Sequence, residues 1–194
     1  RCLLKLVYAH AINAPSNRSR AGAGTVAVCQ TGAGMSGNAT QMLVGATLEF
    51  LRNYPPFDRM EPEALSFLGE HLKLAYYPDA TEIVSPESGP VHVLRIVQRG
   101  KVLARQAGEI SVMEQSQLTL EPGECFPIGS VTAERASTNV YTAHGDVFCF
   151  ELAAADFFVL MQKSAVFHLF CTQYIASLLG QSRQQLMTQY AQRI

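Results

Sequence analysis

The chain has 194 residues, of which 48% are hydrophobic and 16% charged, and its formal net charge is −1. A chain of this length and composition can bury one good-sized hydrophobic core, so we expect one domain with an appendage. The near-zero charge, without a cluster of Lys and Arg, argues against nucleic acid as a partner. No stretch approaches the ~18 uninterrupted apolar residues of a membrane span, so we expect no membrane either.

The cysteines and histidines are scattered and show no metal-ligand spacing. None of the five cysteines forms the C-x-x-C pair of a zinc or redox site, so we expect reduced, mostly buried thiols and a cytoplasmic protein. His92 is followed two places on by Leu94, where a cupin metal site would have a second histidine. We therefore expect no metal and, because no catalytic constellation is found either, no enzymatic activity.

A glycine-rich stretch near the N-terminus matches the phosphate-binding loop of dinucleotide enzymes. Gly32, Gly34 and Gly37 have the G-x-G-x-x-G spacing. A dinucleotide fold also needs a second parallel strand that leads to an acidic residue ~20 positions beyond the glycines. The chain has the helix-stopping segment Tyr54–Asp58 at that place. An NAD-dependent enzyme is therefore the less favoured alternative.

The character of the sequence changes near residue 42. The preceding residues are dominated by Gly, Ala, Ser, Thr and Asn, with too few large apolar groups to offset the entropy of ordering them. We expect residues 1–41 to be a flexible N-terminal segment and residues 42–180 to be the packed domain. Residues 181–194 would be a C-terminal helix extension or linker.

Helical spacing of apolar residues appears at both ends of the packed domain. It predicts one helix in residues 42–57, stopped by Pro55 and Pro56, and a second in residues 61–77 with Pro62 in its first turn. It returns after Ala153, where it predicts a short helix in residues 155–164 and a long one in residues 165–194.

The middle of the chain has the pattern of short strands. Segments rich in Val, Ile and Leu are separated by Gly-containing turn signals. The segments are TEIVS, VHVLRIVQ, KVLARQ, EISVME, QLTLEPG and the two halves of NVYTAHGDVFCFEL around His144-Gly145-Asp146. We predict the α+β class: an antiparallel β jelly-roll barrel of about residues 75–152, with N-terminal helices and a C-terminal helix pair.

From Phe50 to about Leu179 the chain resembles the cyclic-nucleotide-binding domain family. VHVLRIVQRGKV is similar to the strand-then-Gly signature of the family around Gly100, and EPGECFPIG with ERASTNVYTA is similar to its phosphate-binding cassette. GECFPIG, AERASTNVYTA, DVFCFEL and SAVFHLFCTQYIASLL are more similar still to bacterial nucleotidyltransferases in which such a domain precedes CBS domains. The resemblance implies a regulatory domain for cyclic AMP, cyclic GMP or a related nucleotide, signalling to downstream CBS and nucleotidyltransferase domains.

The resemblance also implies the ligand-binding residues. In the family, a Glu after a Gly accepts the ribose 2′-hydroxyl proton, an Arg pairs with the cyclic phosphate, and main-chain N–H groups complete the anion site. By position, Glu124 would take the ribose and Arg135 the phosphate. The residues so implied are Gly123, Glu124, Cys125, Phe126, Arg135, Ala136, Ser137 and Thr138.

Two departures from the family pattern support an alternative. Pro127 removes a main-chain donor from the turn that would hold the phosphate, and Phe126 is large enough to fill the ligand space. Eleven positions separate Glu124 from Arg135, slightly more than in the kinase and activator sensors. The alternative is a ligand-free interaction or dimerisation module.

The C-terminal helix suggests a protein partner. An apolar stripe from Phe167 to Leu178 is followed by Leu186, Met187 and Tyr190 on an otherwise Gln-rich stretch. We expect a homodimer formed through residues 166–190. The alternative is a frayed tail that leads to further domains.

Overall fold

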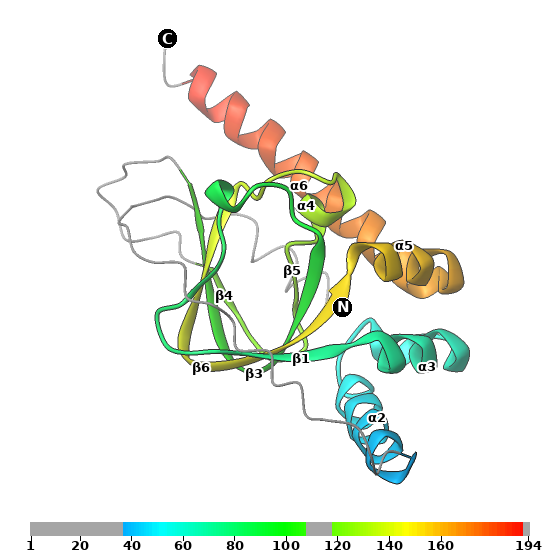
Figure 1. The fold of residues 1–194 in the computed structure, drawn as a ribbon. Coiled ribbons are helices and arrows are strands. Elements are labelled where there is room, and N and C mark those ends of the chain that lie inside the picture. Colours follow the sequence, from blue (N-terminus) through cyan, green and yellow to red (C-terminus); the bar gives the residue numbers. More distant parts are fainter. Residues whose placement is uncertain (1–36, 108–117, 192–194) are drawn as a thin grey trace.

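Helices flank a β-barrel in the computed structural model of the chain, which describes residues 37–107 and 118–191 (Figure 1). The helices are α2 (Gly37–Leu51), α3 (Pro62–His71), α4 (Ile128–Thr132), α5 (Ala154–Lys163) and α6 (Ala165–Ala191), with short 3₁₀ turns η1 (Phe57–Arg59) and η2 (Pro86–Ser88). The strands are β1 (Lys73–Tyr77), β2 (Glu82–Val84), β3 (Val93–Gln106), β4 (Leu118–Leu120), β5 (Cys125–Phe126) and β6 (Asn139–Ala153).

Two long strands, β3 and β6, organise the sheet. They pair antiparallel from Val93↔Ala153 to Gln106↔Asn139, and they carry the shorter strands on their outer edges. β1 and β2 pair with β6, whereas β4 and β5 pair with β3. All of these pairs are antiparallel, which confirms the predicted jelly-roll barrel and does not fit a doubly wound parallel sheet in the described part of the chain.

Two predicted turns are bends within these long strands. The pairing register of β3 with β6 shifts around Arg99, next to Gly100, whose φ is +89°. A Cβ atom on Gly100 would lie 2.5 Å from the main-chain oxygen of Asp146, so the two strands approach closely there. On β6 the opposing bend contains Gly145, with φ +72°. Glycine at these positions lets both strands curve and close the barrel.

The strand β1 corrects a prediction. The helix expected over residues 61–77 ends at His71, and Lys73–Tyr77 pairs with β6 in the register Lys73↔Glu151 to Tyr77↔Val147. The apolar spacing of the helix continues through Leu72 into the strand, so periodicity alone could not separate the two elements. Pairing with β6 decides in favour of the strand.

The structure describes only part of the predicted N-terminal segment, residues 37–41. α2 begins at Gly37, inside the segment that was expected to be flexible, and ends at Leu51 before the predicted proline stop. Gly32 and Gly34, and the predicted strand EISVME, lie outside the described residues. At the other end, α6 continues past Gly180 to Ala191 without a break. The division into segments 1–41, 42–180 and 181–194 stays a prediction.

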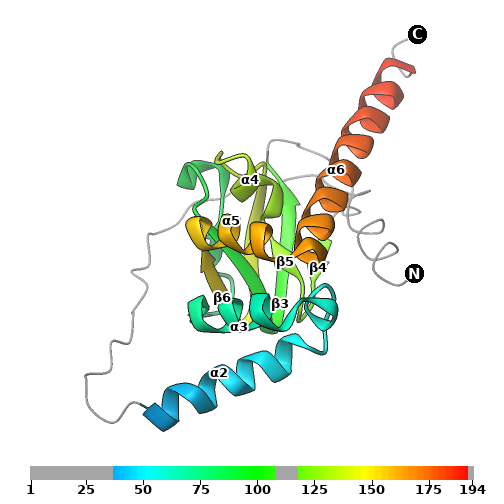
Figure 2. The ribbon, with the colours of Figure 1, turned by 90° about the vertical axis from the view of Figure 1, so that its right-hand side faces the viewer.

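The helix α6 leaves the barrel at an angle and projects beyond it (Figure 2). The chain bends by 114° between α5 and α6, with Ser164 at the break. The Ser164 hydroxyl donates to the Glu61 carboxylate, and the Phe167 N–H donates to Ser164 Oγ at 3.1 Å. The bond from Ser164 and those from the N–H groups of Ala165 and Val166 lower the pKa of Glu61. The residue preceding α3 is thereby tied to the first turn of α6.

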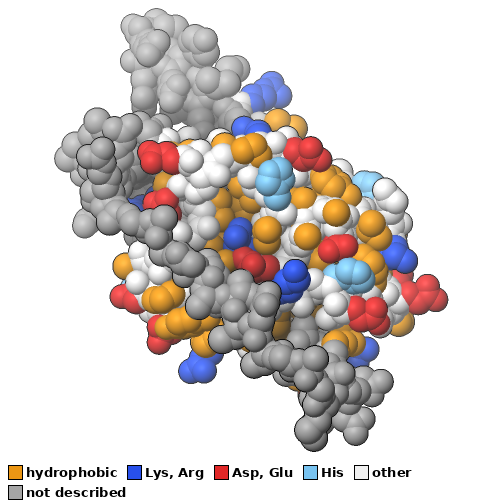
Figure 3. Space-filling view, in the orientation of Figure 1, with side chains coloured by type: hydrophobic (Ala, Val, Ile, Leu, Met, Phe, Trp, Pro, Cys, Tyr) orange, Lys and Arg blue, Asp and Glu red, His pale blue; other side chains and the backbone are white. Residues whose placement is uncertain are grey.

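Charge is mixed over the surface of the barrel end. Figure 3 shows acidic and basic side chains interspersed with hydrophobic ones on this face, without a large area of one sign.

Among the described residues, no single helix is long and apolar enough to cross a membrane. Helix α5 and the part of α6 up to Gly180 meet the length and composition criterion only together, as a bent pair.

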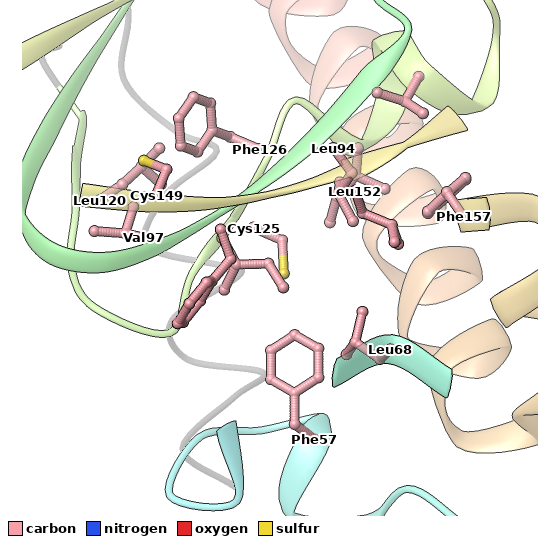
Figure 4. Packing of buried hydrophobic residues seen from close by; sticks show 14 of the residues in the cluster. Phe57, Leu68, Leu94, Val97, Leu120, Cys125, Phe126, Cys149, Leu152 and Phe157 are labelled. Atoms are coloured by element: carbon pink, nitrogen blue, oxygen red, sulfur yellow. The ribbon is translucent and has the colours of Figure 1, made fainter. Parts of the chain in front are cut away.

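The hydrophobic core lies in two layers, one inside the barrel and one between the barrel and the helices (Figure 4). Strand alternation separates them, because successive side chains point to opposite faces. On β6, Cys149 faces the interior, whereas Leu152 packs toward the helices. The helix-side layer contains Phe57, Leu68, Leu94, Leu152 and Phe157, and the interior layer contains Val97, Leu120, Phe126 and Cys149; all are buried. The described helices therefore pack against one half of the barrel.

The bend at Gly100 gives the first testable prediction. Gly100→Ala should lower the free energy of unfolding by about 1–3 kcal/mol, because φ is positive and the new Cβ would meet the Asp146 carbonyl. The matched control is Gly180→Ala in α6, where nothing lies near the added methyl group and the helix should gain up to about 1 kcal/mol. Urea denaturation followed by circular dichroism measures both changes. Equal stability of the Gly100→Ala and wild-type proteins would contradict this account of the bend.

Candidate functional site

The residues with a predicted ligand role lie in one segment, residues 121–138, which we call the cassette segment. It opens with a turn in which the Glu124 N–H donates to the Glu121 carbonyl at 3.1 Å. Gly123 has φ +90°, donates its N–H to the Val97 carbonyl at 2.7 Å, and lies so near the Tyr54 ring that a Cβ atom would be 2.3 Å from it. A glycine is therefore required here by both backbone conformation and space.

The Glu124 carboxylate bonds to its own turn. Its Oε2 accepts a hydrogen bond from the Glu121 N–H at 2.8 Å, and its carbonyl accepts one from the Val97 N–H at 3.0 Å. The side chain is half-buried. A ribose hydroxyl would have to share this carboxylate with the main chain of Glu121.

Phe126 lies inside the barrel. Its ring is 1% exposed and stacks on the Tyr141 ring, with 4.9 Å between centroids and 25° between planes. Burial raises the pKa of Tyr141 to about 12, so its hydroxyl stays neutral. The stacked pair occupies space between β5 and β6 within the barrel.

Cys125 points the other way, toward the helix-side layer. It is buried, and burial raises the pKa of its thiol well above the usual value, with further contributions from Cys171 on α6 and from Glu124. Burial likewise raises the pKa of Tyr174 on the same helix. A thiol in this setting is a packing group between β5 and α6 rather than a nucleophile.

Arg135 follows α4 on the outside of the molecule. Its side chain is exposed and forms no ion pair with any side chain in the described part of the chain. Its main chain is fixed, because its N–H donates to Ser130 at 3.1 Å and its carbonyl accepts from the Val91 N–H at 3.2 Å. The guanidinium is accessible to a ligand in solution.

The three residues after Arg135 complete the cassette segment. Ala136 forms an isolated β-bridge with Pro90. Ser137 is buried and closes a local turn, donating its hydroxyl to the Asn139 carbonyl at 2.7 Å and accepting the Asn139 N–H at 3.1 Å. Thr138 is exposed and accepts the Ala107 N–H at 3.0 Å.

Both ends of the cassette segment are anchored to one stretch of chain that enters β3. The Glu124 end bonds to Val97 and the Arg135 end to Val91, and the short helix α4 spans the interval. The two predicted ligand residues thus flank the same part of the barrel wall. That arrangement is compatible with a common ligand between them.

A charged cluster that the sequence did not reveal crosses the barrel interior beside this stretch. The Arg95 Nε lies 2.9 Å from Glu151 Oε1 and donates to the Tyr77 hydroxyl at 3.0 Å. Tyr77 in turn donates to Glu151 Oε1 at 2.5 Å. Desolvation by burial, first of all, raises the pKa of Tyr77 to about 12. The cluster joins β1, β3 and β6.

A pocket of about 120 Å³ opens next to this cluster, and we call it the Arg95 pocket. It lies between β2, the η2 turn and the start of β3. Its lining consists of Ile83, Val84, residues 88–93 and Arg95. The sequence contains a signal for the charged group in this pocket. In VHVLRIV, strand alternation puts Arg95 on the same face as Val93 and Val97.

The described residues contain no group of three or more His, Cys, Asp and Glu side chains that could hold a metal ion. The described cysteines, Cys125, Cys149 and Cys171, are buried free thiols. The predictions of no metal and of reduced cysteines in the whole chain stay predictions.

Comparison by sequence finds no counterpart, whereas comparison by fold does. No model of a known protein family matches the chain, and no curated protein matches it. Solved structures with the same fold include the regulatory domain of Toxoplasma gondii PKA with cAMP, at TM-score 0.60 and 20% identity. The match covers 70% of this chain and 51% of that one.

Two further structures extend this likeness. The catabolite activator protein of Thermus thermophilus matches at TM-score 0.51 and 20% identity, over 70% of this chain and 61% of that one. The regulatory subunit of a cAMP-independent protein kinase A from Trypanosoma cruzi, bound to guanosine, matches at TM-score 0.59 and 15% identity, over 79% and 52%. The chain thus spans 51–61% of the length of these three proteins. It has the fold of cyclic-nucleotide-binding domains.

The Tyr77 hydroxyl gives a prediction about alkaline stability. Its pKa rises from 10.0 to about 12 on folding, so the folded state holds the proton more tightly than the unfolded state. The resulting stability is present below pH 10 and is lost as the pH rises toward about 12. The free energy of unfolding should therefore fall more steeply over this range in the wild type than in Tyr77→Phe. Parallel pH profiles for the two proteins, measured by urea denaturation, would contradict the assignment.

Proposed function

We propose that the chain is a regulatory domain that binds a cyclic nucleotide or a related nucleotide. The observation that carries this proposal is the cassette segment, in which Gly123-Glu124 and Arg135 flank a short helix on a jelly-roll barrel. Cyclic AMP would suit these groups, because Glu124 can accept the ribose hydroxyl and Arg135 can pair with the phosphate. The N–H groups near Ala136, Ser137 and Thr138 would assist.

The ligands bound to proteins with the same fold support the choice of ligand class. One is a kinase regulatory domain with cAMP and another a kinase regulatory subunit bound to guanosine. A purine nucleoside with or without a cyclic phosphate is therefore the class to test. The exposed Arg135 favours a ligand that carries a phosphate.

We further propose that the domain signals to CBS and nucleotidyltransferase domains in a longer cytoplasmic protein. This proposal rests on the similarity of the GECFPIG and AERASTNVYTA stretches to bacterial nucleotidyltransferases in which such a domain precedes CBS domains. α6 supports it, because the helix extends beyond the barrel and can contact other parts of a protein (Figure 2).

A second function is favoured by three observations on the cassette segment. Phe126 and Tyr141 fill space in the barrel interior, and Glu124 already bonds to its own turn. Pro127 contributes no N–H at the start of α4. The second candidate is therefore a ligand-free interaction or dimerisation module with the same fold.

Calorimetric titration with cyclic AMP, cyclic GMP and NADH distinguishes these functions. Saturable heat with either cyclic nucleotide supports the sensor, and heat with NADH alone supports the dinucleotide alternative. No heat with any of them supports the ligand-free module.

Substitutions in the cassette segment test the predicted roles. Arg135→Ala should weaken cyclic-nucleotide binding by about 2–5 kcal/mol, because the phosphate would lose its charge-assisted partner. Glu124→Ala should weaken it less. The matched control is Arg99→Ala, which removes an exposed arginine from β3 and should leave the affinity unchanged. If Arg135→Ala binds like the wild type, the nucleotide occupies a different site.

Dimerisation through residues 166–190 is tested by light scattering at micromolar concentration. The wild type should have the mass of a dimer, because the sequence spaces Leu186, Met187 and Tyr190 as a narrow apolar strip that a second copy would cover. Leu186→Asp with Met187→Asp should give a monomer. A monomeric wild type, or a dimer that survives both substitutions, would contradict this interface.

A further inference from the structure

The Arg95 pocket has a charged group on a wall of mixed polar and apolar character. Hydrophobic side chains form most of its lining, with Ser88 and His92 as the other polar side chains and Arg95 as the guanidinium. The Arg95 side chain is only 14% exposed. An arginine in such surroundings is costly to bury unless its N–H groups find acceptors.

The orientation of Arg95 is fixed by its neighbours on β1 and β6. The contacts to Glu151 Oε1 and to the Tyr77 hydroxyl are both made by Nε. Tyr77 donates its own proton to Glu151 and therefore accepts, rather than donates, toward Arg95. A guanidinium has five N–H donors in one plane, and these contacts use the one on Nε, whereas the other four are on its terminal nitrogens.

The size of the pocket limits what those nitrogens can bind. A volume of about 120 Å³ is well below the ~300–1,000 Å³ of sites for drug-sized ligands, so a whole nucleotide does not fit. The pocket has room for several water molecules. It suits a tetrahedral or planar oxyanion, whose oxygens match the fork of a guanidinium.

We propose that the Arg95 pocket binds a small oxyanion, a phosphate or carboxylate group, through the terminal nitrogens of Arg95. Glu151 and Tyr77 act as positioning residues, because they hold the guanidinium at Nε and leave its outer edge to the ligand. This site differs from the proposed nucleotide site, since neither Glu124 nor Arg135 lines it.

The two sites are neighbours along the chain that enters β3. Pro90 lines the Arg95 pocket and bridges to Ala136, and Val91 lines it and donates to the Arg135 carbonyl at 3.2 Å. A test must therefore separate an oxyanion at Arg95 from one held by the exposed Arg135.

Amide chemical shifts of the ¹⁵N-labelled chain provide this test. The protein is titrated with sodium phosphate and, separately, with sodium acetate, each against sodium chloride at matched ionic strength. We expect saturable shifts at Gly89, Val91, Val93 and Arg95 with at least one oxyanion. The phosphate and acetate arms show which group is preferred. Shifts that do not saturate, that appear equally with chloride, or that centre on residues 135–138 would overturn the proposal.

Matched variants locate the binding group. Arg95→Gln combined with Glu151→Gln removes the ligand group without leaving an unpaired charge, and it should weaken binding at least tenfold. Arg99→Gln on the same strand should leave the affinity unchanged. If the double variant loses its native spectrum, Arg95→Lys provides the second comparison, because it keeps a cation beside Glu151 but loses the planar fork. Wild-type affinity in both Arg95 variants would overturn the proposal.

Discussion

The pairing of β3 with β6 is the constraint on which the other parts of this molecule depend. Each of these strands is long enough to pass through both halves of the barrel, and each has a glycine where the two halves meet. Because the strands are continuous, a side chain near Val93 and one near Gln106 are fixed relative to each other by a single ladder of hydrogen bonds. The shorter strands add to its edges, and the helices cover its outer face at one end.

The same pairing explains why both proposed sites lie near the start of β3. The cassette segment is hydrogen-bonded to Val91 and Val97, and the Arg95 cluster projects from the residues between them. One short run of backbone therefore supports both features. The cassette segment bonds to the main-chain groups of this run, whereas the cluster is built on the Arg95 side chain.

Sequence pattern predicted the elements whose signals are local. Pro62 marks the start of α3, and the return of helical spacing after Ala153 marks α5 and α6. The strand β1 was not predicted. Its five residues follow α3 closely and continue the apolar spacing of that helix, so the sequence contains no separate sign of a strand. Glycine at positions 100 and 145 was interpreted as a break between strands, whereas the long-range ladder carries both strands through a bend.

The candidate sites also differ in how far the sequence predicts them. The cassette segment could be found from its motif, because its residues are close in sequence. The Arg95 cluster could not, because Tyr77, Arg95 and Glu151 come from three strands and meet only through the observed register.

The hydrogen bond from Ser164 to Glu61 holds the start of α6 next to the barrel, and the rest of the helix projects from that point. The helix has 27 residues, so at 1.5 Å per residue it is about 40 Å long. A rotation of about 10° at Ser164 would displace its far end by about 7 Å, by simple geometry on that length. A shift of a fraction of an ångström where Glu61 meets the first turn of α6 is therefore enlarged many times at the other end. The contact of Glu61 with Ser164 lies at the start of α6, the end about which such a rotation would turn.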